Sequence, residues 1–209
     1  KVYQDILDNR NALLSKQTLV DEQQLIFWTQ KLWDLSKIIE KNRRDFLSII
    51  SNKAITILKL FWPESSITFE YINKEEYRDT FEDFIEKNHN NNVFIKEKKY
   101  GRSLFGAHLD DIDITIGSKK ARYFSSRGQQ KLIVMVLKIA LVEHLIETHG
   151  PTAFLLDDFT TDFDQSVSIK LMDLCLTLKA QLIFVSPLYN GPESIFLQEK
   201  NILSLKITL

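Results

Sequence analysis

Ser126-Arg127-Gly128-Gln129 stands directly before a long apolar stretch with helical spacing. The free N–H groups and the positive dipole end at the start of a helix bind phosphate. Gly128 would let a ligand come close to the backbone. The alternative is a plain helix N-cap, with Ser126 as the capping residue. This segment is therefore a candidate phosphate site or a structural cap.

A second segment, Leu155-Leu156-Asp157-Asp158, places two carboxylates where a buried strand ends. Ligands of open α/β sheets lie outside the carboxyl ends of the strands. There Asp157 would hold Mg²⁺, and Asp158 would orient or polarise an attacking water. The alternative is a solvated acidic turn.

A phosphate-cradling P-loop is absent from the 209 residues. The best match to its glycine and lysine spacing runs from Gly101 to Gly106, but Ala107 and His108 follow where the lysine should stand. The chain therefore lacks the loop that cradles the β- and γ-phosphates.

The cluster Gly106-Ala107-His108-Leu109-Asp110-Asp111 follows directly. His108 near two carboxylates could form a metal or acid–base site. The alternative is a structural histidine in a turn.

Between residues 96 and 131 the chain has nine lysines and arginines but only four acidic residues, although its net charge is −1. Such a local excess is suited to DNA phosphates. The candidate DNA contacts are Lys96, Lys98, Lys99 and Arg102. A solvated basic face is the alternative.

The composition, with 44% hydrophobic and 26% charged residues, is ordinary for a globular protein. Cys175 is the only cysteine, so no internal disulfide can form, as expected in a reducing cytosol. No apolar run is long enough for a membrane span, and no signal peptide is evident. We expect a cytoplasmic protein without membrane contact. Because the chain begins at Lys1 inside a helical pattern, we expect it to be part of a longer protein.

Apolar spacing predicts long amphipathic helices over residues 1–62, with their tryptophans and phenylalanines in the core. The polar run 88–92 is the predicted domain boundary, which gives a helical lobe (1–92) and a second part (93–209). The alternation of strands and helices in the second part predicts an α/β layer. The other predicted helices are 74–87, 129–148 and 165–180, and the predicted strands are 67–71, 99–105, 113–116, 152–156, 181–185 and 202–207.

These segments resemble the RecF family, bacterial repair ATPases related to ABC and SMC heads, and the resemblance covers most of the chain. The 106–111 cluster resembles the family's GPHRDD motif, and Asn9-Arg10-Asn11 resembles its QRN segment. Residues 124–131 resemble the signature motif. Leu155–Asp158, followed by Thr161-Asp162-Phe163-Asp164, resembles the family's LLDD and D-loop sequence.

The resemblance implies the C-terminal half of an ABC-type ATPase head with an attached, mainly helical second lobe. It implies ATP and Mg²⁺ as cofactors, an ATP-dependent homodimer, action on gapped DNA with RecO and RecR, and a place in DNA repair, replication and the SOS response. By matched position, Asp157 would be the Mg²⁺ ligand and Asp158 the catalytic carboxylate. Asp162 and Asp164 would belong to the D-loop. The signature residues Ser126, Arg127, Gly128 and Gln129 would contact ATP held by the partner subunit.

The chain departs from the family pattern at several positions. Ala107 and Leu109 replace the proline and arginine of GPHRDD, and residues 161–163 alter the D-loop. Ser186-Pro187 stands where a switch histidine is expected. Three hypotheses follow: an ATP-dependent repair protein of RecF type, a DNA-binding or scaffold relative that does not hydrolyse ATP, and an SMC-like head of another DNA-processing system.

Overall fold

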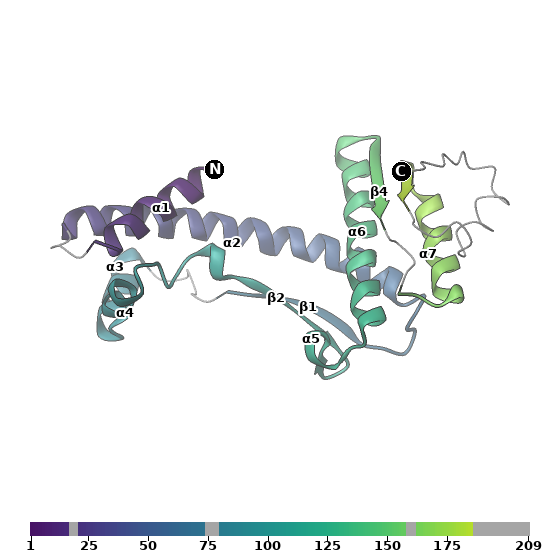
Figure 1. The fold of residues 1–209 in the computed structure, drawn as a ribbon, viewed down its shortest axis with the longest axis horizontal. Helices are drawn as coiled ribbons and strands as arrows, with labels where there is room; N and C mark the ends of the chain where they lie inside the picture. The colour runs from purple at the N-terminus through teal and green to yellow at the C-terminus, as the bar shows by residue number, and fades with distance from the viewer. Residues whose placement is uncertain (17–20, 74–79, 158–161, 186–209) are drawn as a thin grey trace, which may run out of the picture. The chain divides into compact units, whose positions relative to one another are not determined.

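The computed structural model describes residues 1–16, 21–73, 80–157 and 162–185 (Figure 1). The chain separates into two compact units. Unit 1 comprises Lys1–Ser48 and Phe69–Asp113. Unit 2 comprises Ile49–Thr68 and Ile114–Leu209, with its described part ending at Val185. The predicted boundary at residue 92 does not coincide with this division, and the two-domain assignment stays a prediction.

The N-terminal part is helical, as predicted. Helices α1 (Val2–Leu14) and α2 (Glu22–Leu58) account for most of residues 1–62. The Asp21 carboxylate accepts the first free N–H groups of α2 and so caps it. Two buried clusters form the core of unit 1: Leu7, Leu32, Trp33, Phe84 and Phe105 in one, and Leu13, Leu14 and Leu25 in the other.

The prediction that every aromatic of this part packs in the core is only partly right. Trp33 and Phe84 are buried, whereas Phe27 and Phe46 are exposed. Three-to-four spacing gives the side of a helix on which a ring lies but not whether another element covers that side.

Unit 1 continues with a strand and two short helices. Strand β1 (Ile67–Ile72) is confirmed, and helix α3 (Phe81–Asn90) begins at a Thr80–Asp83 capping box, later than the predicted residue 74. Residues 74–79 lie outside the described part. The predicted break at 88–92 shrinks to Asn91 and Asn92, because α3 runs to Asn90 and α4 starts at Val93.

The strand predicted over 99–105 is wrong. Helix α4 (Val93–Tyr100) occupies the first of these residues, and Gly101 ends it with a φ of 62°. The helix places Glu97 at a position where it meets Arg10, 87 residues earlier in the chain. A tertiary contact therefore overrides the weak local preference of this segment.

Strands β1, β2 (Asp111–Ile116) and β3 (Lys119–Lys120) form one sheet in that order. Strands β2 and β3 pair antiparallel, and Gly117 makes the turn between them at a φ of 61°. Residues 121–124 then form a single helical turn, α5 (Ala121–Phe124) (Figure 1). The strand over 113–116 is thus confirmed.

The described part of unit 2 is an α/β layer, as predicted. Helix α6 (Arg127–His149) leads to strand β4 (Thr152–Asp157), and helix α7 (Gln165–Thr177) leads to strand β5 (Ala180–Val185). Strands β4 and β5 pair in parallel, from Thr152 opposite Ala180 to Asp157 opposite Val185. Phe154 and Leu156 of β4 are buried. The strand predicted over 202–207 lies outside the described residues.

Parallel strands are normally covered on both faces. Here Leu155, Ile183 and Val185 on the other face of the β4–β5 pair are exposed. Within the described part of unit 2, this face of the β4–β5 pair is therefore an exposed apolar surface.

Candidate functional site

The signature segment lies at the N-terminus of α6, as predicted. Ser126 is the N-cap: its Oγ accepts the Gln129 N–H at 3.2 Å, and Gln129 Oε1 accepts the Ser126 N–H at 2.9 Å. This reciprocal pair is a capping box. The Ser126 hydroxyl acts as an acceptor here, so its own proton is left to donate. The structural cap and the anion site are thus compatible interpretations of the same residues.

Gln130 ties the preceding turn to this helix start. Its side-chain amide donates to the carbonyl oxygens of Ala121, Arg122 and Ser125, at 3.4, 3.3 and 3.1 Å. These hydrogen bonds connect helix α5 to the signature segment and hold the two backbone segments in a fixed arrangement.

The signature segment adjoins the predicted D-loop. A Cβ at Gly128 would lie 3.2 Å from the Asp162 carbonyl oxygen, closer than most real contacts. Lys131 Nζ forms an ion pair with Asp162 Oδ2 at 3.0 Å and lies 5.3 Å from the ring centre of Phe163. The fold thus brings together two motifs that helix α6 and strand β4 separate in the sequence.

Asp157 is the last residue of β4, and its side chain is exposed at the carboxyl end of the strand. Asp158 and Thr161 lie outside the described residues. No group of three or more metal-ligating side chains forms within the described part of the chain. A single carboxylate at a strand end suits Mg²⁺ that takes its other ligands from phosphate and water. Asp157 therefore fits the metal role but does not build a complete metal site.

Asp164 has a structural role at the start of α7. Its carboxylate accepts the Val167 N–H and the Ser166 hydroxyl, each at 2.9 Å. The hydrogen bond from the Val167 backbone, followed by that from Ser166, lowers the pKa of Asp164. Asp164 is therefore a helix cap, whatever else it contacts.

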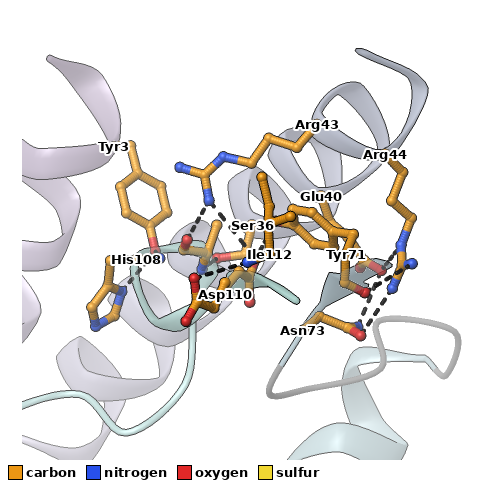
Figure 2. A network of polar contacts seen from close by, with 12 residues as sticks. Tyr3, Ser36, Glu40, Arg43, Arg44, Tyr71, Asn73, His108, Asp110 and Ile112 are labelled. Atoms are coloured by element: carbon orange, nitrogen blue, oxygen red, sulfur yellow. Dashed lines mark hydrogen bonds and ion pairs between the residues drawn. The ribbon is translucent and has the colours of Figure 1, made fainter. Parts of the chain in front are cut away.

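The His108 cluster is a structural junction of unit 1 (Figure 2), and the described residues form no metal-ligating group there. The Tyr3 hydroxyl lies 2.9 Å from His108 Nδ1 and accepts the His108 backbone N–H at 3.2 Å. Gly106 permits this approach, because its φ is 121° and a Cβ there would lie 2.6 Å from the Tyr3 hydroxyl. The structural interpretation of His108 thus has direct geometric support.

Burial governs the ionisation of this junction. It lowers the pKa of His108, although the residue as a whole is exposed, and it raises the pKa of Tyr3. Burial and a 2.6 Å hydrogen bond to Asp110 raise the pKa of Tyr71 to about 12. Both tyrosines and His108 are therefore neutral at pH 7.

Helix α2 completes the junction through contacts that no local sequence pattern indicates. The Ser36 hydroxyl accepts the Ala107 N–H at 3.2 Å, and Arg43 donates to the Ala107 carbonyl. Arg43 and Tyr71 both point toward Asp110 (Figure 2). Asp110 Oδ1 is buried without a hydrogen-bond partner among the described residues. The 106–111 motif thus joins α1, α2 and β1.

A second junction of unit 1 is a fully buried ion pair. Arg10 and Glu97 are both 0% exposed, and their side chains meet at 2.7 and 3.0 Å. Arg10 also donates to Thr29 Oγ1 at 2.9 Å and to Ser103 Oγ at 2.7 Å. Asn11 accepts both the N–H and the hydroxyl of Ser103. The Asn9-Arg10-Asn11 segment therefore joins α1 to α4 and to the loop that follows α4.

The predicted DNA contacts Lys96, Lys98, Lys99 and Arg102 are all exposed, on α4 or just after it. Glu97, in the middle of this basic helix, points inward to Arg10. The lysines and arginines from 119 onward belong to unit 2. The basic run of 96–131 is therefore two patches, one in each compact unit.

None of the helices in the described part of the chain combines the length and the apolarity that crossing a membrane requires.

Comparison with known proteins gives consistent relatives, although no family model matches. The "DNA replication and repair protein RecF" of Vibrio vulnificus (strain YJ016) is 29% identical over 178 residues, 85% of this chain and 47% of the relative. The RecF protein of Vibrio cholerae serotype O1 (strain ATCC 39541) is 29% identical over 193 residues, which are 92% of this chain and 51% of the relative. The RecF protein of Aliivibrio fischeri (strain MJ11) is 30% identical over 178 residues, which are 85% of this chain and 47% of the relative.

Two solved structures agree with these relatives. The recombination mediator protein RecF with ATPrS, described in the RecFOR pathway, is 25% identical, with a TM-score of 0.69 over 89% of this chain and 52% of its own. RecF with ATP has the same TM-score at 24% identity and supports the fold alone. The chain spans about half the length of the relatives it matches. In sequence and in mixed α/β fold, this chain resembles the C-terminal portion of RecF.

Proposed function

We propose that this chain is the signature-bearing part of an ATP-dependent DNA-binding protein of recombinational repair and replication-fork maintenance. The observation that carries the proposal is the placement of three motifs within unit 2. The signature segment caps α6, it adjoins the D-loop at Asp162, and Asp157 ends the strand that follows α6. The similarity to proteins named for DNA replication and repair supports the same conclusion.

The signature segment would bind the γ-phosphate of ATP held by a second copy of the protein. Ser126 and Gln129 are exposed, and the first N–H groups of α6 stand beside them. Arg127 adds an exposed positive charge. Gly128 keeps the backbone accessible, although its neighbour Asp162 limits the space on one side. ADP lacks the γ-phosphate, so the dimer would loosen after hydrolysis, since that group makes the differential contact.

Asp157 would coordinate Mg²⁺ and Asp158 would orient the attacking water, as in phosphoryl-transfer enzymes generally. The 209 residues contain no P-loop, whose lysine and backbone amides bind most of the triphosphate. This chain alone is therefore expected not to hydrolyse ATP.

The exposed basic side chains Lys96, Lys98, Lys99 and Arg102 would contact DNA phosphates, with little dependence on base sequence. Mediator proteins of the RecO and RecR type are the proposed partners, and the cytoplasm is the proposed location. A relative that binds DNA without hydrolysis is the second candidate, and the altered D-loop residues 161–163 favour it.

Steady-state ATP turnover by the full-length protein separates the two candidates. Asp158→Asn should preserve ATP binding and slow hydrolysis roughly 10²-fold, if Asp158 is the general base. Asp173→Asn, an exposed carboxylate on α7, is the matched control and should leave turnover unchanged. Equal turnover by wild type and Asp158→Asn would place the catalytic carboxylate elsewhere. Absence of turnover in the wild type would favour the second candidate.

A further inference from the structure

The segment just before the signature combines exposed cations with exposed aromatic rings. We define the α5 patch as Lys119, Lys120, Arg122, Tyr123 and Phe124. Tyr123 is 72% exposed and Phe124 is 67% exposed, among the highest values for large apolar side chains in the described chain. Both rings stand on a single helical turn beside exposed cationic side chains. Large rings are costly to leave in water, so a ligand that covers them is favoured.

Charge identifies the kind of ligand. No aspartate or glutamate lies between Asp113 and Glu143, whereas six lysines and arginines do. A second copy presenting the same patch across a two-fold axis would bring these cations together. An apolar partner would leave them poorly solvated. A polyanion with flat apolar groups suits both the cations and the rings.

We propose that the α5 patch binds single-stranded nucleic acid. Tyr123 and Phe124 stack on unpaired bases, and the cationic side chains form ion pairs with the phosphates. Bases in a duplex are already stacked on one another, so only unpaired bases can stack on these rings. A lipid surface is less suitable, because one helical turn offers too little apolar area for membrane binding. This inference rests on the proposed DNA-binding function and assigns it a second contact, separate from α4.

The patch is built to hold its rings in place. Ala121 is buried under the turn, and Gln130 donates to the carbonyl oxygens of Ala121 and Arg122. Lys119 Nζ lies 5.6 Å from the ring centre of Phe124, within cation–π range. A braced turn loses little conformational freedom on binding, and this favours affinity.

The test compares two fluorescent oligonucleotides, single-stranded oligo-dT and a blunt duplex of equal length, binding to the full-length protein with ATP present. The Tyr123→Ala, Phe124→Ala double variant should lose about tenfold or more in affinity for the single strand, as expected for stacking. Its duplex affinity should stay within about twofold, and its salt dependence should be unchanged, because phosphate contacts remain. Phe27→Ala, which removes an exposed ring from α2, is the control and should change neither affinity.

Cross-linking provides a second readout that does not depend on the stability of the variant. A strand carrying 5-iodo-deoxyuridine should cross-link on irradiation to Tyr123 or Phe124 of the wild-type protein, identified by mass spectrometry. Cross-links confined to α4 would overturn the proposal.

The outcomes also separate this inference from the proposed function. If the wild type binds both oligonucleotides and the double variant binds them equally well, the α5 patch is not the contact and the proposed function stands. If the wild type binds neither, the proposed function itself fails. If the double variant loses self-association but keeps single-strand affinity, the patch is an interface between copies of the chain, and the inference is wrong.

Discussion

The two compact units use their polar side chains in opposite ways. In unit 1, Arg10, Glu97 and Asp110 are removed from water and bind partners far away in the chain. In unit 2, Ser126 and Asp164 are exposed and bind residues three positions away. A buried long-range contact specifies a fold, whereas an exposed local one leaves its group accessible to a ligand. The buried polar motifs of unit 1 are therefore structural, whereas its exposed basic side chains on α4 and the exposed signature segment of unit 2 are available for binding.

The largest effect should come from the buried ion pair of unit 1. Arg10→Met should lower the free energy of unfolding by about 3–5 kcal/mol, because it leaves the Glu97 carboxylate buried without its partner. Urea unfolding followed by circular dichroism measures this, with Lys99→Met on the exposed side of α4 as the control. The double variant Arg10→Met, Glu97→Leu should recover part of the loss. A loss below about 1 kcal/mol for Arg10→Met would contradict the claim that the buried polar contacts of unit 1 stabilise the fold more than the exposed ones of unit 2.

The next effect should come from Gly106. Gly106→Ala forces a strained φ and places a methyl group on the Tyr3 hydroxyl, so it should cost about 1–3 kcal/mol. Gly117→Ala is the matched control, because Gly117 also has a positive φ but nothing lies within 4 Å of its Cβ position. The difference in unfolding midpoint between the two variants isolates the contact with Tyr3. Equal midpoints would mean that the Tyr3–His108 junction contributes little.

In unit 2 the corresponding loss should be small. Ser126→Ala removes one capping-box hydrogen bond and should cost about 1 kcal/mol, as helix caps do. Urea unfolding measures it alongside Arg10→Met. A loss as large as that of Arg10→Met would make the signature segment a stability element.

The smallest effect concerns pH. Because burial lowers the pKa of His108 below its usual 6.5, the unfolded chain takes up the proton first as the pH falls. The His108 contribution to stability is therefore complete above pH 6.5 and is lost as the pH falls through the folded pKa. His108→Gln should flatten this part of the stability–pH curve. An unchanged slope between pH 7 and pH 5 would mean that His108 is not the titrating group.

Local sequence patterns were enough to predict where the main helix and strand of unit 2 begin and end. The start of α6 at Ser126 follows from a capping residue before an apolar run, and the end of β4 at Asp157 follows from a short apolar strand meeting carboxylates. The helices of unit 1 followed from three-to-four spacing in the same way.

The long-range contacts could not be predicted. Tyr3 and His108 are 105 residues apart, and nothing near either residue identifies the other. In the sequence Glu97 does not differ from the exposed charges around it, so its buried contact with Arg10 could not be predicted. The one available signal was Gly106, since a glycine within a polar motif often marks a close approach of other atoms.

The central claim is that the signature segment of unit 2 binds a nucleotide held by a second copy of the protein. Sedimentation velocity of the full-length protein with ATP, with ADP and without nucleotide tests it most directly. Wild type should sediment as a dimer with ATP and largely as a monomer with ADP. Asp173→Asn, an exposed carboxylate on α7 outside the signature segment, is the control and should behave as the wild type does. Ser126→Arg should bind ATP as a monomer yet fail to dimerise. A Ser126→Arg protein that still dimerises with ATP would contradict the claim and leave Ser126 as a helix cap only.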